Sequence, residues 1–146
     1  MDQKSYQKIV NSTLRWLDLQ HIKVGVTIRS DIDRGRGYYD TKEVQLPAWL
    51  EECDPHYRIY YVVHELTHCL LGYRHDKPFK RVEDVLLGLW DIAIERKKVY
   101  PKRLFHDGKE VLNIPHQTKL LRSVINETCK RNEEQKENQP DNPAGQ

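Results

Sequence analysis

The sequence predicts an α+β fold in which a short mixed sheet with an edge strand packs against helices. Residues 21–29 alternate between apolar and polar side chains, a period of two that is typical of a half-buried strand. Residues 3–19 and 55–71 instead carry apolar side chains at spacings of three and four, which is typical of helices that bury one face. The 146 residues are enough for one domain with a modest core. We predict that this domain spans residues 1–130.

The remaining residues, 131–146, are predicted to form a disordered polar tail. They contain no large apolar side chain, so they cannot bury enough surface to offset the entropy lost on ordering. The tail holds four acidic and two basic residues, a net charge of −2, and since the formal total is +2 the rest of the chain carries +4. This mild charge is not typical of a dedicated nucleic-acid binder. Two local basic runs, Arg74 to Arg81 and Arg96 to Arg103, are interpreted as solvated helix ends and loops.

The cysteine pattern and the N-terminal residues indicate the cellular compartment in which the protein is expected. Cys53, Cys69 and Cys129 are widely spaced and include no Cys-x-x-Cys pair, which argues against a disulfide framework or a zinc ribbon. The N-terminal residues lack the charged-then-apolar pattern of a signal peptide, and no run approaches the roughly 20 apolar residues of a membrane span. We therefore expect a soluble cytoplasmic protein with no membrane partner.

The first half of the chain supplies the sheet. Residues 3–19 are predicted to form a helix that covers one face of it, and residues 21–29 the first strand. Residues 36–40 and 43–46 are predicted to form a hairpin around a polar turn. Because Pro47 bounds the second of these strands, we expect 43–46 to lie at an edge of the sheet.

The second half is predicted to be largely helical. Residues 48–53 suit a helical turn, and Asp54 and Pro55 suit the N-cap and first position of a helix that ends near Leu71. A further helix is predicted over 79–97. The segment 100–115 is expected to be irregular, with a weak strand near 110–114, and the last helix is predicted over 116–130.

The middle helix contains the pattern His64-Glu65-Leu66-Thr67-His68. Residues four apart share a helix face, so His64 and His68 can hold one metal ion, with the Glu65 carboxylate beside its open position. Neutral imidazoles suit zinc, and a catalytic zinc site uses three protein ligands and leaves a fourth position for water.

His75 is the first candidate for the third ligand. Gly72 can end the helix in a left-handed C-cap, after which the chain turns back and His75 follows three residues later. The alternative is Glu83 or Asp84, which lie 15 and 16 residues after His68 on the next predicted helix. If His75 is the ligand, Asp84 or Asp91 is expected to hydrogen-bond a ligand histidine. Phe79 is interpreted as a core residue or as a wall that fixes the His75 turn.

These parts together resemble a small zincin-type metallopeptidase, most of all the SprT-like and WLM group. The resemblance rests on Gly37-Tyr38-Tyr39-Asp40, on Val44-Gln45-Leu46-Pro47, and on His64 to His68 followed by His75-Asp76-Lys77-Pro78-Phe79. It implies a zincin-like domain in which the edge strand 43–46 pairs with the backbone of an extended substrate. Six residues separate His68 from His75, where metzincins have five, and the Cys-rich zinc ribbon common in SprT-like proteins is missing from this sequence.

The leading hypothesis is a zinc-dependent metallopeptidase, an endopeptidase acting on a protein or peptide substrate. Zinc on His64, His68 and His75 would activate a water, and Glu65 would be the general base. One alternative is a catalytically weak or inactive zinc-bearing binding or regulatory module. Another is a DNA-associated protease, which the basic runs and the SprT-like resemblance motivate. No motif identifies an oxyanion stabiliser or an oligomeric state; Tyr38, Tyr39, Tyr73 and Arg74 are interpreted as packing or surface residues.

Overall fold

The structure is a computed structural model that describes residues 2–112, 125–126 and 129–131. The chain divides into two units, Met1–Ile114 and Pro115–Gln146. The first unit has the predicted α+β fold. Its helices are α1 (Gln3–Trp16), the 3₁₀ helix η1 (Ala48–Glu52), α2 (Pro55–Leu71) and α3 (Lys77–Gly88). Its strands are β1 (Gly25–Arg29), β2 (Arg36–Tyr38), β3 (Glu43–Pro47), β4 (Ile92–Lys97), β5 (Tyr100–His106) and β6 (Lys109–Val111).

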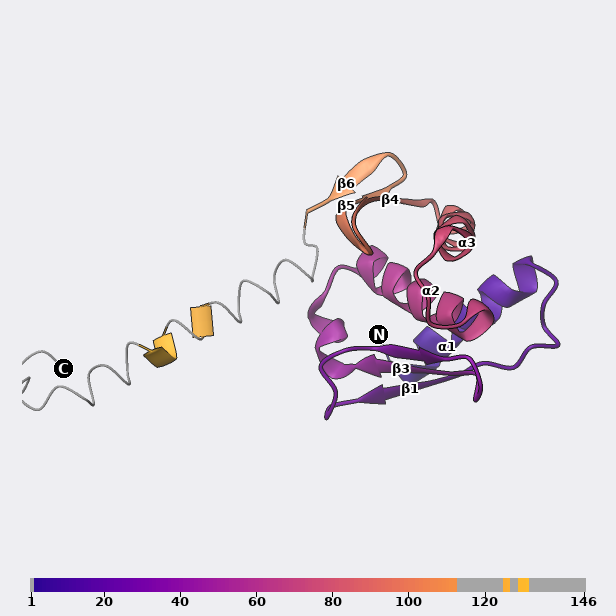
Figure 1. Ribbon diagram of the computed structural model, residues 1–146, viewed down its shortest axis with the longest axis horizontal. Coiled ribbons are helices and arrows are strands. Elements are labelled where there is room, and N and C mark those ends of the chain that lie inside the picture. The colour runs from indigo at the N-terminus through magenta and orange to yellow at the C-terminus, as the bar shows by residue number, and fades with distance from the viewer. Residues whose placement is uncertain (1, 113–124, 127–128, 132–146) are drawn as a thin grey trace, which may run out of the picture. The chain divides into compact units, whose positions relative to one another are not determined.

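The first three strands form a mixed sheet in the order β1-β3-β2. β1 runs parallel to β3, with Val26 opposite Val44, and β2 runs antiparallel to β3, with Gly37 opposite the same Val44. α1 and α2 lie on one face of this sheet (Figure 1). The inward side chains of β1 and β3 pack there against the helices, which forms the core. The predicted hairpin of β2 and β3 is confirmed.

The prediction that residues 43–46 form an edge strand is wrong, because β3 lies in the centre of the sheet. Pro47 is the last residue of β3 and leads directly into η1, so its missing N–H lies where the ladder ends. The edges are β1 and β2. The outer edge of β1 is covered by α1: Gln7 donates to the Val24 carbonyl at 2.7 Å and accepts from the Val26 N–H at 3.0 Å.

Two element boundaries differ from the prediction. α1 ends at Trp16 instead of residue 19, and Asp18 then adopts a left-handed φ of 58°. β1 begins at Gly25 instead of residue 21. The residues just before it are held by a turn, in which the Ile22 N–H donates to the Leu19 carbonyl at 3.0 Å. The alternation is confirmed, since Val24 and Val26 are both buried.

α2 forms as predicted and runs through the middle of the first unit. The Asp54 side chain accepts a hydrogen bond from the His56 N–H at 2.8 Å, and Pro55 is the first helical residue. The helix ends at Gly72, whose φ of 97° and ψ of −167° suit glycine alone. The Gly72 N–H donates to the His68 carbonyl at 2.9 Å, which closes the last turn. Buried side chains cover most of this helix because the mixed sheet, α1 and α3 all contact it.

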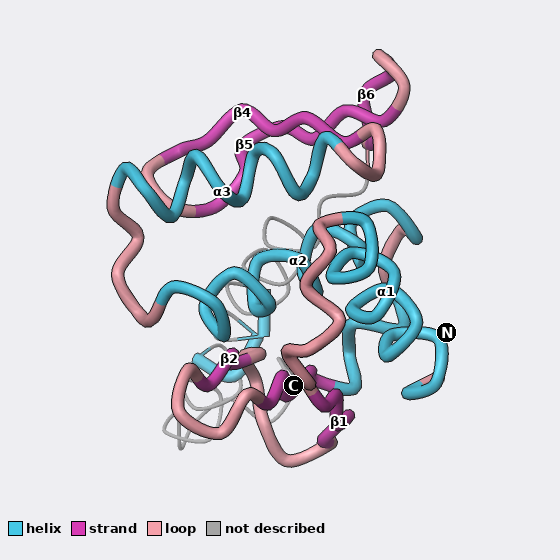
Figure 2. The backbone as a smooth tube through the Cα atoms, turned by 90° about the vertical axis from the view of Figure 1, so that its right-hand side faces the viewer, coloured by secondary structure: helices cyan, strands magenta, loops and turns pink. Residues whose placement is uncertain are grey.

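The predicted helix over 79–97 is wrong in its second half. α3 ends at Gly88, Asp91 adopts a φ of 56°, and Ile92 begins a strand. The residues 92–97 form β4, which pairs antiparallel with β5 in a second sheet of order β4-β5-β6. The segment 100–106 is therefore a strand and not irregular as predicted. The weak strand expected near 110–114 is present as β6, after a turn at 107–108. Figure 2 shows this hairpin alongside α3.

In the second unit, residues 125–126 and 129–131 are helical. The rest of the predicted helix over 116–130, and nearly all of the tail 131–146, lie outside the described residues. The domain bounds therefore remain predictions. No helix in the described part of the chain has both the length and the apolar character that crossing a membrane requires.

Candidate metal centre

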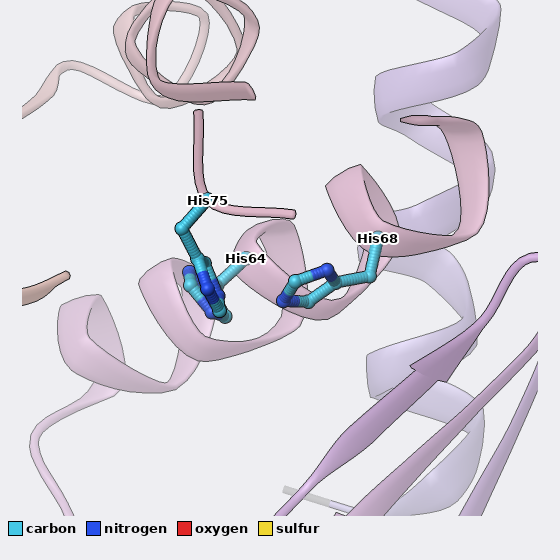
Figure 3. Close-up of side chains that lie close together, drawn as sticks. All are labelled: His64, His68 and His75. Atoms are coloured by element: carbon cyan, nitrogen blue, oxygen red, sulfur yellow. The ribbon is translucent and has the colours of Figure 1, made fainter. Parts of the chain in front are cut away.

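Three histidine side chains meet beside α2. His64 and His68 come from the helix, and His75 comes from the turn between α2 and α3 (Figure 3). One ring nitrogen of each histidine lies within 4.8 Å of those of the other two. The His75 ring centre is 5.3 Å from that of His64 and 4.6 Å from that of His68. The structure thus brings together the three residues that the sequence predicts as ligands.

The turn after α2 orients His68. Its Nδ1 donates to the Gly72 carbonyl at 2.8 Å, which leaves Nε2 as the nitrogen with a free lone pair. Burial lowers the pKa of His68 to about 4, so its ring is neutral at pH 7. Burial also lowers the pKa of His75, with a smaller contribution from the neighbouring His64. Neutral imidazoles are the form that binds metal ions.

Glu83 of α3 orients His64. Its side chain is buried and its Oε2 accepts a hydrogen bond from His64 Nδ1 at 2.5 Å. Its other oxygen accepts from Arg96 Nη2 at 2.8 Å, and Arg96 also pairs with Asp84 at 2.7 Å. Burial alone would raise the pKa of Glu83, but the contacts with His64 and Arg96 outweigh it and lower that pKa. Glu83 is therefore a buried carboxylate.

The carboxylate that accepts the hydrogen bond from His64 is thus Glu83, not Asp84 or Asp91 as expected. The Asp84 side chain faces solvent and pairs with Arg96, not with a histidine. Asp91 lies beyond the end of α3, in the turn that leads into β4. The interpretation of Arg96 as part of a solvated basic run is wrong, because its side chain packs over these carboxylates and is only 16% exposed.

The nitrogens fit a metal ion. Nδ1 of both His64 and His68 is engaged, so each ring offers Nε2 to the group. Nε2 of His75 is buried and has no hydrogen-bond partner in the described part of the chain. A buried nitrogen without a partner is rare in proteins and calls for an unseen ion or water. The three histidines therefore form a candidate metal centre.

Glu65 lies beside the histidines on α2. It is buried, and this burial raises the pKa of its carboxyl to about 7. Gly37 of β2 packs directly on the same helix turn, because a Cβ atom at position 37 would clash with the Glu65 carbonyl. Gly35 packs against Tyr61 in the same way, and its N–H donates to the Tyr61 hydroxyl at 2.8 Å. These two glycines allow β2 to approach α2 closely.

β2 and the histidines border a cavity of about 430 Å³, hereafter the site cavity. It is lined by Arg34, Gly35, Arg36, Gly37, Tyr38, His64, Glu65, His68, Tyr73, His75 and Tyr100. Tyr38 and Tyr73 therefore lie at the site, whereas Tyr39 and Arg74 are not among its lining residues. Phe79 is a buried core residue whose ring lies against all three imidazole rings, which agrees with both interpretations of it.

Tyr100 is a site residue that the sequence prediction missed. It begins β5, and its ring centre lies 6.1 Å from that of His64. The sequence predicts an irregular segment here, and an irregular segment does not place Tyr100 near the histidines. The alternation of Ile92, Ala93, Ile94 and Glu95 is the signal that would have revealed the hairpin that carries it.

The chain matches no protein-family model and no curated protein. Among solved structures it is similar to the crystal structure of the metallopeptidase zymogen of Pyrococcus abyssi abylysin. The TM-score is 0.48 and the sequence identity 20%, over 54% of this chain and 76% of that chain. The candidate metal centre itself therefore carries the functional assignment.

Proposed function

We propose that the protein is a zinc-dependent endopeptidase with His64, His68 and His75 as the metal ligands and Glu65 as the general base. The observation that carries the proposal is the group of three imidazole nitrogens with the buried Glu65 carboxyl beside it, next to β2, an edge strand of the mixed sheet. Three imidazole ligands with a fourth position left for water are typical of catalytic zinc. The SprT-like or WLM subgroup is a finer prediction that rests on the sequence motifs alone.

Zinc would supply Lewis acidity toward a water molecule and toward the scissile carbonyl. The chain supplies the orientation of the ligands. Glu83 and the Gly72 carbonyl fix which nitrogen of His64 and His68 faces the centre, and Phe79 packs against all three rings. Partners of this kind typically account for a factor of about 10–100 in metal affinity.

Glu65 would take a proton from the attacking water and deliver it to the leaving amine. A general acid-base group works best when its pKa lies near the working pH, because it must both accept and release a proton. In the metal-free protein burial raises the pKa of Glu65 to about 7, and a zinc ion beside the carboxyl would lower it and favour the proton-accepting form.

The substrate would bind as an extended peptide along β2. The strand expected to bind it, 43–46, has neighbours on both sides and cannot pair with a further chain. β2 pairs only with β3 in the mixed sheet, and its residues line the site cavity together with the histidines. Backbone pairing at a sheet edge gives affinity for peptides of many sequences.

Metal content and peptide cleavage test the proposal together. We expect about one zinc per chain in the wild type, loss of zinc in His75→Ala, and retention in Glu65→Gln, whose cleavage of peptides should fall by about 10²-fold or more. Zinc retained in His75→Ala but lost in Glu83→Ala would replace His75 by Glu83 as the third ligand. A zinc-loaded wild type that cleaves no peptide would favour the zinc-bearing binding module.

A further inference from the structure

The site cavity carries a charge pattern that the proposed chemistry does not use. Two of its lining residues, Arg34 and Arg36, are exposed arginines. Neither forms an ion pair in the described part of the chain. By contrast, Arg29, Arg96 and Arg103 each lie on a carboxylate. Glu65 is the only carboxylate among the residues that line the cavity. The rim along β2 is therefore positively charged.

The alternation along β2 fixes the direction of one of these side chains. A Cβ atom at Gly37 would point into α2, and successive side chains of a strand point to opposite faces. Arg36 and Tyr38 therefore project from the face of β2 that turns away from the helix. The register agrees, because Arg36 lies opposite Gln45, whereas Gly37 lies opposite the fully buried Val44. Figure 2 shows β2 beside α2.

The backbone that carries Arg34 is anchored on both sides. The Asp33 carbonyl accepts a hydrogen bond from Trp49 Nε1 at 2.8 Å. The Gly35 N–H donates to the Tyr61 hydroxyl at 2.8 Å. Trp49 and Tyr61 contact each other edge to face, with ring centres 5.7 Å apart. Arg34 thus stands at a fixed place, two residues before Arg36, and not on a free loop.

A peptide that pairs with β2 would meet this pattern in a defined way. The peptide residue opposite Gly37 turns its side chain toward α2 and the histidines, while those opposite Arg36 and Tyr38 turn theirs outward. Directly opposite residues of paired strands have Cβ atoms about 5 Å apart, and opposite charges at that separation attract. An outward peptide side chain opposite Arg36 would therefore lie beside that arginine, and the next outward side chain would extend toward Arg34, which precedes the strand by two residues.

From this geometry we infer that the site cavity selects extended peptides with acidic side chains at alternate positions, which pair with Arg34 and Arg36. The inference rests on the proposed binding of a peptide along β2, and it adds the substrate class to the proposed function. Two exposed ion pairs contribute a preference of about tenfold in affinity, which decreases as salt is added.

The test separates binding from cleavage. Fluorescent peptides that share one neutral backbone would carry Glu at two alternate positions, Glu at two adjacent positions, Lys at the alternate positions, or Gln at all of them. Their dissociation constants would be measured by anisotropy on zinc-loaded Glu65→Gln protein, and their cleavage on the wild type. We expect the alternating Glu peptide to bind about tenfold more tightly than the Gln peptide.

Charge variants test the residues. Arg34→Gln/Arg36→Gln should abolish the preference, and Arg34→Glu/Arg36→Glu should transfer it to the Lys peptide. Arg29→Gln is the matched control, because Arg29 lies on β1 of the same sheet and is already paired with Asp31. It should leave the preference unchanged. The comparison of peptides uses protein that keeps both arginines. The inference can therefore still be tested if a charge variant fails to fold.

Other outcomes distinguish the two proposals. A charge preference in binding without any cleavage would support the inference and contradict the peptidase. Cleavage without a charge preference would support the peptidase and overturn the inference. The absence of any peptide binding would also overturn the inference. Single-stranded DNA that binds more tightly than the alternating Glu peptide, through the same two arginines, would also overturn it in favour of a nucleic-acid partner.

Discussion

Replacing Glu83 with glutamine tests how the fold prepares His64 for a metal ion. Glutamine has nearly the same shape and can still accept the hydrogen bond from His64 Nδ1 through its carbonyl oxygen. It removes the negative charge. In the wild type the carboxylate accepts a hydrogen bond from Arg96 at 2.8 Å, whereas the glutamine amide N–H would face the guanidinium N–H and no hydrogen bond could form. Asp84→Asn is the matched control, because it removes a carboxylate from the same arginine at the solvent side.

The magnitude follows from burial. The Glu83 side chain is only 1% exposed, so water cannot replace the lost contact. Losing a hydrogen bond to a charged group costs about 1.5–3 kcal/mol of unfolding free energy. For a unit of this size, about 2 kcal/mol corresponds to a fall in Tm of roughly 10 °C. Mutation of the group that hydrogen-bonds a metal-binding histidine typically lowers metal affinity by about 10–100-fold, and here the change removes the negative charge while keeping an acceptor for His64 Nδ1. Asp84→Asn should change stability by less than about 1 kcal/mol, as expected for an exposed pair.

Two measurements check these values. Thermal unfolding of the metal-free proteins gives the cost to the fold, and competition with a chelating dye gives the zinc affinity. Zinc affinity within twofold of the wild type in Glu83→Gln, together with the expected fall in Tm, would refute the reasoning. Glu83 would then stabilise the packing of α3 on α2 without preparing His64.

Three further predictions concern the framework. Gly37→Ala should lower the Tm by several degrees because its Cβ clashes with the Glu65 carbonyl, whereas Gly25→Ala, with open space around it, should not; equal Tm values would contradict the close approach of β2 and α2. Trp90→Phe should cost about 1 kcal/mol in denaturant unfolding through loss of the hydrogen bond to Thr13, and adding Thr13→Val should cost little more. Additive losses would show that the bond contributes nothing. In thiol titration of the native protein Cys129 should react first, because Cys53 and Cys69 are buried. Burial also raises the pKa of Cys69 to about 12, which disfavours its reactive thiolate. Fast reaction of all three cysteines would contradict this burial.

The sequence predicts the histidine group well because the information is local. Four residues along a helix place His64 and His68 together, and a glycine that requires a positive φ returns the chain to bring His75 back. Asp54 and Pro55 likewise define the start of α2 through contacts within one turn. Such features depend on the neighbours along the chain, so pattern and spacing are sufficient to find them.

The errors about β3 and Glu83 involve contacts between residues that are distant in sequence. Whether β3 lies at an edge depends on which strands pair with it, and β1 joins it from 18 residues away in sequence. Glu83 meets His64 across 19 residues and Arg96 across 13, so no spacing rule selects it over Asp84. The helix predicted over 79–97 joins two different patterns. The apolar spacing of α3 is followed directly by the alternation of β4, and no proline separates them.

The glutamines of α1 have a consequence for how the protein behaves with copies of itself. Gln7 occupies the outer Val24 carbonyl and Val26 N–H of β1, and Gln3 accepts from the Ile28 N–H at 3.2 Å. Side-chain amides thus stand where the backbone of another strand would bind, and an open strand edge is a template for aggregation. The first two turns of α1 therefore block the addition of another strand at β1. In the mixed sheet this leaves β2 as the edge with room for strand pairing.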